Sequence, residues 1–251
     1  MKTRLVVAML VLALSGQALA EDHPAECRLG LPEVEHDFPL PHVAQAIAAK
    51  HLDVLVVGAG SSRLPGASGV QKAYPARLQA ALTAKLPGIA VKVTADVQAR
   101  RSAAEMVKTL PAALTAAKPE LMVWQTGTVD AMDSVDIDQF RAALEHGISV
   151  AHSAGADVVF INAQYSPRTE SMIALGLYAD NMRWVALQQQ VPVFDRFAIM
   201  KLWADLGTFD FYAATKKLDM AERVHDCIGQ LLADLVIESA KPDAPHAENG
   251  R

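Results

Sequence analysis

The sequence lacks several features that would point to particular classes of protein. It has no apolar run long enough to span a bilayer, the one near the N-terminus included, and no cysteine directly follows residue 20 to carry a lipid, so we expect no membrane insertion. The histidines other than His225 lack metal-ligand spacing, and we expect neither a metal nor a cofactor. Acidic residues (28) outnumber basic ones (23), which argues against a nucleic-acid partner.

The N-terminal residues 1–20 have the composition of a secretory signal peptide. Lys2 and Arg4 form a charged start, residues 5–14 are apolar, and Ala18-Leu19-Ala20 is a small-x-small cleavage site. Cleavage would leave a chain that begins near Glu21. It would remove two basic residues and no acidic one, which takes the formal charge from −5 to −7. We therefore expect an exported protein, either periplasmic or secreted.

The chain contains only two cysteines, Cys27 and Cys227, near opposite ends of the mature sequence. An oxidising compartment favours a disulfide between them, which would join the two ends of the chain. Two separate buried thiols are the alternative.

Short apolar runs alternate with longer amphipathic ones, a pattern typical of βαβ units around a parallel sheet. Strands are predicted over residues 52–57, 89–94, 121–125, 158–162 and 191–194. Helices are predicted over residues 75–85, 103–117, 137–153, 171–190 and 221–239. We expect one α/β domain over residues 21–240, a three-layer α/β/α sandwich with about five strands in flavodoxin-like order, and a disordered tail over 241–251.

One strand-end loop, Gly58-Ala-Gly60-Ser-Ser-Arg63, begins like a dinucleotide-binding turn. A true fingerprint has a third glycine where Arg63 stands and an acidic residue about 20 positions further on. Asp96 is the first acidic residue after the second predicted strand, and it comes too late. Leu64-Pro65-Gly66 also predicts a loop in place of a helix start. Nucleotide binding is therefore the less favoured interpretation.

Read together, the loops that follow the predicted strands resemble a bacterial, exported branch of the SGNH (GDSL-type) hydrolase family. The matching segments cover nearly the whole mature chain: Gly58–Ser68, Tyr74-Pro75-Ala76-Arg77-Leu78, Trp124-Gln-Thr-Gly127-Thr128, Gln164-Tyr165-Ser-Pro167, Arg196-Phe-Ala-Ile-Met200 and Cys227-Ile-Gly. The resemblance implies a three-layer α/β/α fold and ester hydrolysis by a serine. In that family a histidine activates the serine and an aspartate three residues earlier orients the histidine. The serine amide, a glycine amide and an asparagine side chain form the oxyanion hole.

The family's catalytic positions fall on different residues in this sequence. Matching Gly66-Ala67-Ser68 and Tyr74-Pro75 without gaps places Gly60 on the nucleophile. Val97 stands at the oxyanion-hole glycine, and Val129 at the asparagine after Trp124-Gln125-Thr126-Gly127-Thr128. Counting back from Cys227 places Lys216 on the aspartate and Asp219 on the histidine. The resemblance thus implies a pseudoenzyme.

A different alignment of the first loop predicts an active enzyme. A shift by two residues offers Ser62 as the nucleophile, with Ser61 beside it, and Glu222-Arg-Val-His225 imitates an acid-x-x-histidine pair. Against this, the position of Cys227 places His225 about one turn inside the last helix. This alternative would be a serine esterase or deacetylase acting on a small ester or an acylated carbohydrate.

If the catalytic residues are lost, the loops can still form a binding or interaction surface. Arg100, Gln125, Thr128 and Asp219 are the candidate ligand-binding residues, and Arg100 could hold an anionic group. The partner would be a small molecule or a protein that the sequence does not identify.

Overall fold

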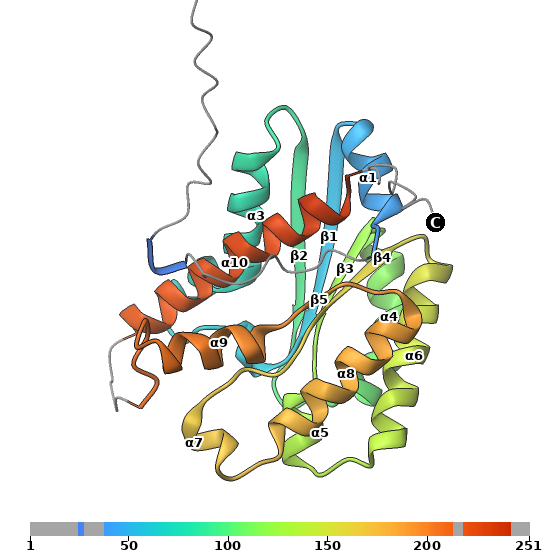
Figure 1. The fold of residues 1–251 in the computed structure, drawn as a ribbon. Coiled ribbons are helices and arrows are strands. Elements are labelled where there is room, and N and C mark those ends of the chain that lie inside the picture. The colour runs from blue at the N-terminus through green and yellow to red at the C-terminus, as the bar shows by residue number, and fades with distance from the viewer. Residues whose placement is uncertain (1–24, 28–37, 213–217, 242–251) are drawn as a thin grey trace, which may run out of the picture.

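The computed structural model describes residues 25–27, 38–212 and 218–241, and these form a five-stranded parallel sheet covered by helices. The strands follow the order β2-β1-β3-β4-β5, and Figure 1 shows the sheet among its helices. The strands are β1 (His51–Gly58), β2 (Ala90–Val97), β3 (Leu121–Gln125), β4 (Asp157–Ile161) and β5 (Val193–Phe194). Every neighbouring pair is parallel. The three-layer fold and the flavodoxin-like order predicted from the sequence are confirmed.

The long helices cover both faces of this sheet (Figure 1). One face carries α1, α3 and α10, and the other carries α4, α6 and α8. These helices are α1 (Pro41–Ala48), α3 (Tyr74–Lys85), α4 (Ala103–Ala117), α6 (Ile137–Ser153), α8 (Leu175–Gln189) and α10 (Asp219–Ser239). Within the described ranges, no helix has the length and apolar character needed to span a membrane.

Short helical segments complete the fold, and the sequence pattern did not predict them. They are η1 (Ala25–Cys27), η2 (Gly60–Ser62), α2 (Gly69–Lys72), α5 (Thr128–Met132), α7 (Pro167–Glu170) and α9 (Arg196–Asp205). The helix predicted over 171–190 begins only at Leu175, because residues 171–174 form a turn after α7. The strand predicted over 191–194 shortens to β5, since the amide of Val191 still closes the end of α8 on Ala186.

The central strands β3 and β4 are buried along their whole length. Apolar side chains on both faces are what a parallel strand between two helical layers requires. On this core the rings of Trp124 and Phe160 pack with centroids 5.5 Å apart. The carboxyl ends of all five strands meet at one edge of the sheet, where η2, α5, α7 and α9 lie, and this edge positions the candidate site.

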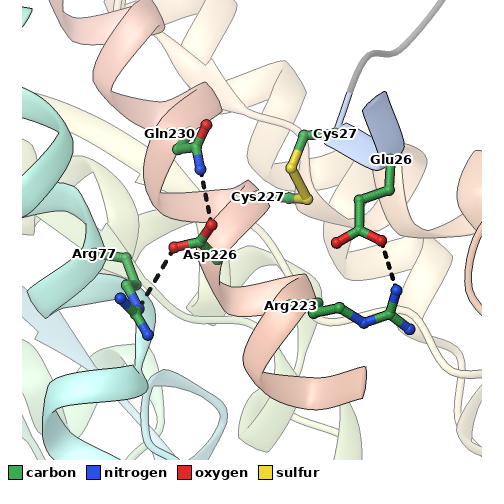
Figure 2. The surroundings of a disulfide bond; sticks show 7 residues. All are labelled: Glu26, Cys27, Arg77, Arg223, Asp226, Cys227 and Gln230. Atoms are coloured by element: carbon green, nitrogen blue, oxygen red, sulfur yellow. Dashed lines mark hydrogen bonds and ion pairs between the residues drawn. A yellow bond between two sulfur atoms is a disulfide. The ribbon is translucent and has the colours of Figure 1, made fainter. Parts of the chain in front are cut away.

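The predicted disulfide between Cys27 and Cys227 is present, with Cα atoms 5.1 Å apart (Figure 2). Both cysteines are fully buried. The bond fixes η1 to the middle of α10, and an ion pair between Glu26 and Arg223 lies beside it. On the other side of α10, Asp226 pairs with Arg77 of α3 at 3.5 Å. The disulfide therefore holds the N-terminal segment against the same helix that carries His225.

Candidate functional site

The loop after β1 is a short 3-10 turn, η2, followed by an irregular stretch to residue 68. No helix starts directly after β1, so the phosphate-binding helix end of a dinucleotide site is not formed there. Gly58 is needed for close packing, since a Cβ would lie 2.3 Å from the Ser62 hydroxyl. Gly60 is exposed, and a Cβ there would meet no heavy atom within 4 Å. The position matched to the nucleophile is therefore open and carries no hydroxyl.

The two serines of this turn are hydrogen-bonded to an amide oxygen. The hydroxyl of Ser62 donates to Gln125 Oε1 at 2.7 Å, and that of Ser61 donates to the same oxygen at 3.1 Å. The amide of Ala59 is a third donor to it, at 3.3 Å. Ser62 is 1% exposed and also lies 2.9 Å from the Tyr74 hydroxyl, whose pKa burial raises to about 12. A neutral amide oxygen cannot take a proton from either serine near neutral pH.

His225 lies in α10, nearly two turns after the helix begins at Asp219 and therefore deeper than predicted, and is 5% exposed. Its Nδ1 accepts a hydrogen bond of 2.9 Å from the backbone amide of Tyr74, and the two rings stack with centroids 5.9 Å apart. Burial, together with the nearby charge of Arg196, lowers the pKa of His225 to about 3. The imidazole is therefore neutral, with its proton on Nε2. No hydrogen bond among the described residues joins it to Ser61 or Ser62.

A second buried group at this edge is Arg196, the first residue of α9, which is 1% exposed. Its guanidinium donates to the backbone oxygen of Ser61 at 3.1 Å and to Gln164 Oε1 at 3.0 Å. It also lies over the Tyr74 ring, 5.9 Å from the centroid. Burial lowers the pKa of Arg196 to about 10, so it stays charged at neutral pH. Only one feature of the sequence points to Arg196: it opens the matched segment after the last predicted strand.

In the second loop the buried arginine is Arg101, whereas Arg100 is exposed and has a positive φ of 59°. Arg101 donates to the carboxylate of Asp96 at 2.9 Å and to the backbone oxygen of Gly58 at 3.3 Å. It therefore ties the end of β1 to the end of β2. Val97, at the position matched to the oxyanion-hole glycine, is the last residue of β2 and is partly buried.

The third loop is held by a buried carboxylate. Asp130 accepts hydrogen bonds from the amides of Ala103 and Gly127 and from the Thr126 hydroxyl, while burial raises its pKa. Gly127 has a φ of 96°, which favours glycine. Val129, matched to the family's asparagine, is half-buried and packs against the core.

The remaining predicted site residues are more scattered. Thr128 is the first residue of α5, and its hydroxyl oxygen is buried without a hydrogen-bond partner. Asp219 is exposed at the first turn of α10. Lys216 lies outside the described residues. The described part of the chain contains no group of three or more histidine, cysteine, aspartate or glutamate side chains that could hold a metal ion.

The site therefore contains one connected hydrogen-bond network at the carboxyl edge of the sheet. Gln125 joins Ser61 and Ser62, Tyr74 joins Ser62 to His225, and Arg196 closes on the backbone of Ser61. The network includes Ser61, Ser62 and His225, the residues predicted for an active enzyme. Tyr74, however, lies between the serines and the imidazole.

Comparison with known proteins agrees with the fold. The model of a non-GDSL lipase-like family matches residues 26–242. Among solved structures, TesA superposes with a TM-score of 0.56 at 20% identity, covering 72% of this chain and 99% of TesA. A lipase/acylhydrolase from Enterococcus faecalis gives 0.56 at 21% identity, covering 77% and 100%. A catalytic mutant of Axe2, an acetylxylan esterase from Geobacillus stearothermophilus, gives 0.57 at 15% identity, covering 75% and 94%.

These structures are SGNH/GDSL hydrolases, so the fold resemblance predicted from the sequence is confirmed. At identities below 25% they establish the fold alone. No curated protein matches the sequence.

Proposed function

The chain belongs to the non-GDSL lipase-like family, and we propose that it is an exported protein that no longer hydrolyses esters. It uses the loops at the carboxyl edge of the sheet to bind a small molecule or a protein. The observation that carries this proposal is the hydrogen bonding of His225, whose Nδ1 accepts from the Tyr74 backbone and not from a serine hydroxyl. The His225 imidazole therefore has a structural use.

Serine catalysis needs a hydroxyl and a base within hydrogen-bond reach of each other. Gly60 has no hydroxyl to offer. Ser62 is buried, and its proton points to the Gln125 amide oxygen. Losing the nucleophile alone can lower the rate of a serine hydrolase by roughly a million-fold.

The oxyanion side of the site supports the same proposal. Val129 carries no side-chain donor and packs against the core. Removing one such donor from a serine hydrolase costs about a hundred- to a thousand-fold in rate. Val97 keeps its amide, but it is the last residue of strand β2, whose extended backbone a β-branched residue adopts readily, so the loop geometry that glycine allows is not used at this position.

Export is part of the proposal and draws its support from the disulfide. A buried bond between Cys27 and Cys227 is stable in an oxidising compartment. The proposed signal peptide over 1–20 lies outside the described residues, as does all but the first residue of the proposed tail over 241–251. Residues 21–240 remain the proposed domain.

The alternative function is a serine esterase or deacetylase that uses Ser61 or Ser62 with His225. One observation favours it: Ser61, Ser62 and His225 belong to a single hydrogen-bond network that runs through Gln125 and Tyr74. Its substrate would be a small ester or an acylated carbohydrate, by analogy with the acetylxylan esterase.

A fluorophosphonate probe separates the two functions, because it labels an activated serine without needing the natural substrate. We expect the purified mature protein to label no more than the same protein after unfolding, while a known serine esterase in the same reaction labels fully. Stoichiometric labelling at Ser61 or Ser62 that is lost in His225→Asn would overturn the proposal. Asparagine is the sharper replacement, since its Oδ1 can still accept from the Tyr74 amide.

A further inference from the structure

Arg196 is a buried cation without a counter-ion among the described residues. It is 1% exposed, and both of its hydrogen bonds go to uncharged oxygens, those of the Ser61 backbone and the Gln164 amide. Arg101, the other buried arginine of this edge, pairs with Asp96 at 2.9 Å. Buried charges are normally paired, because removing an ion from water is costly. Within the described part of the chain, Arg196 therefore lacks the carboxylate partner that Arg101 has.

Unused hydrogen-bond donors surround Ser61. A guanidinium has five N–H donors, and Nε of Arg196 is buried with no partner. Nε2 of Gln125 is also buried with no partner, while its Oε1 accepts from the Ser61 hydroxyl. Both unsatisfied groups are donors. What this part of the site lacks is therefore an acceptor, and beside an unpaired cation the matching acceptor is an anion.

Gly60, directly before Ser61, lies at the surface of this turn. Gly60 is exposed, and the space its side chain would occupy holds no heavy atom within 4 Å. Two further cations, Arg63 and Arg100, are exposed on loops at the same edge of the sheet. Their charge would favour the approach of an anion.

We propose that this edge of the sheet binds a small carboxylate, whose oxygens enter past Gly60 and accept hydrogen bonds from Arg196 and Gln125. A carboxylate is favoured over larger anions because its two coplanar oxygens match the fork of a guanidinium. The inference deepens the proposed function, since it rests on a site that binds without hydrolysing. It assigns the ligand class as a free organic acid or the acid group of a sugar.

The test compares the thermal unfolding of the mature protein in acetate, galacturonate, phosphate and chloride at matched ionic strength and pH. We expect a saturable rise in Tm with one or both carboxylates, of about 3–6 °C at tenfold excess over Kd, and none with chloride. Acetate alone indicates a free acid, whereas a stronger effect of galacturonate indicates a sugar acid. A rise as large with phosphate or chloride indicates an adventitious ion only and overturns the proposal.

Gln164→Glu is the decisive variant, because it gives Arg196 a carboxylate within the chain. We expect it to raise Tm in the absence of ligand and to abolish the effect of acetate. Gln79→Glu is the matched control. Gln79 lies on α3, and its Oε1 accepts from the backbone amide of Val93 in the edge strand β2 and is not one of the two oxygens that bind Arg196, so the acetate effect should remain. Gly60→Leu gives a second test that leaves the buried network intact, and it should block the carboxylate.

Retention of the carboxylate effect in Gln164→Glu or in Gly60→Leu would overturn the inference, as would its loss in Gln79→Glu. Fluorophosphonate labelling keeps the two proposals apart. A labelled serine in a protein that still binds acetate refutes only the proposed function. An unlabelled protein with no carboxylate effect refutes only the ligand.

Discussion

Replacing His225 with asparagine should change how the stability of the protein depends on pH. In the folded chain the imidazole is buried, and its Nδ1 accepts from the amide of Tyr74. Asparagine carries an acceptor oxygen at a similar distance from the backbone but has no group that titrates in this range. The substitution therefore removes the titration and keeps the hydrogen bond.

The sign and size of the effect follow from the lowered pKa. Burial lowers the pKa of His225 in the folded chain to about 3, against 6.5 for a solvent-exposed histidine. The unfolded chain binds a proton below pH 6.5 and the folded chain does not, so the stability is full above pH 6.5 and is lost as pH falls toward 3. Between pH 7 and pH 5 the loss amounts to about 2 kcal/mol, since each pKa unit corresponds to roughly 1.4 kcal/mol.

Urea unfolding at pH 7 and pH 5, followed by far-ultraviolet circular dichroism, measures this loss. The quantity to compare is the change in free energy of unfolding for wild type minus that for His225→Asn, because the buried carboxyls Asp130 and Asp157 contribute equally to both. His146→Asn, which removes an exposed imidazole, is the control and should behave like wild type. The reasoning is refuted if wild type and His225→Asn lose the same stability between the two pH values.

Three further predictions concern stability. Replacing Cys27 and Cys227 with alanine opens a loop with a sequence separation of 200 and should cost about 5 kcal/mol in the chain-entropy model; equal urea midpoints for the variant and the oxidised wild type would contradict it. Gly147→Ala puts a Cβ 2.2 Å from the fully buried ring of Trp124 and should destabilise by about 1–3 kcal/mol, with a lower Tm. Ser102→Ala removes the N-cap of α4 and should cost about 1 kcal/mol in thermal unfolding, and an unchanged Tm would count against the cap.

The elements whose bounds were predicted correctly are those with a clear pattern of apolar residues within one continuous segment. The helices over 103–117 and 137–153 and the strand over 121–125 have the predicted bounds. Fifteen or more residues of amphipathic period, or a short run of apolar residues between turns, leave few alternatives for the chain. The short helices α5 and α9 were missed, because five to ten residues at a loop do not show a helical period clearly.

For the site, the sequence by itself determined which loops meet and which residue types stand in them: parallel strands bring their carboxyl ends to one edge, so Gly60, Gln125 and Val129 had to lie near each other. Only the tertiary structure decided the contacts. The bond from Tyr74 to His225 spans 151 residues, and that from Ser62 to Gln125 spans 63. Packing among distant segments decides which arginine is buried and which nitrogen of the imidazole carries the proton. No local pattern in the chain encodes either outcome.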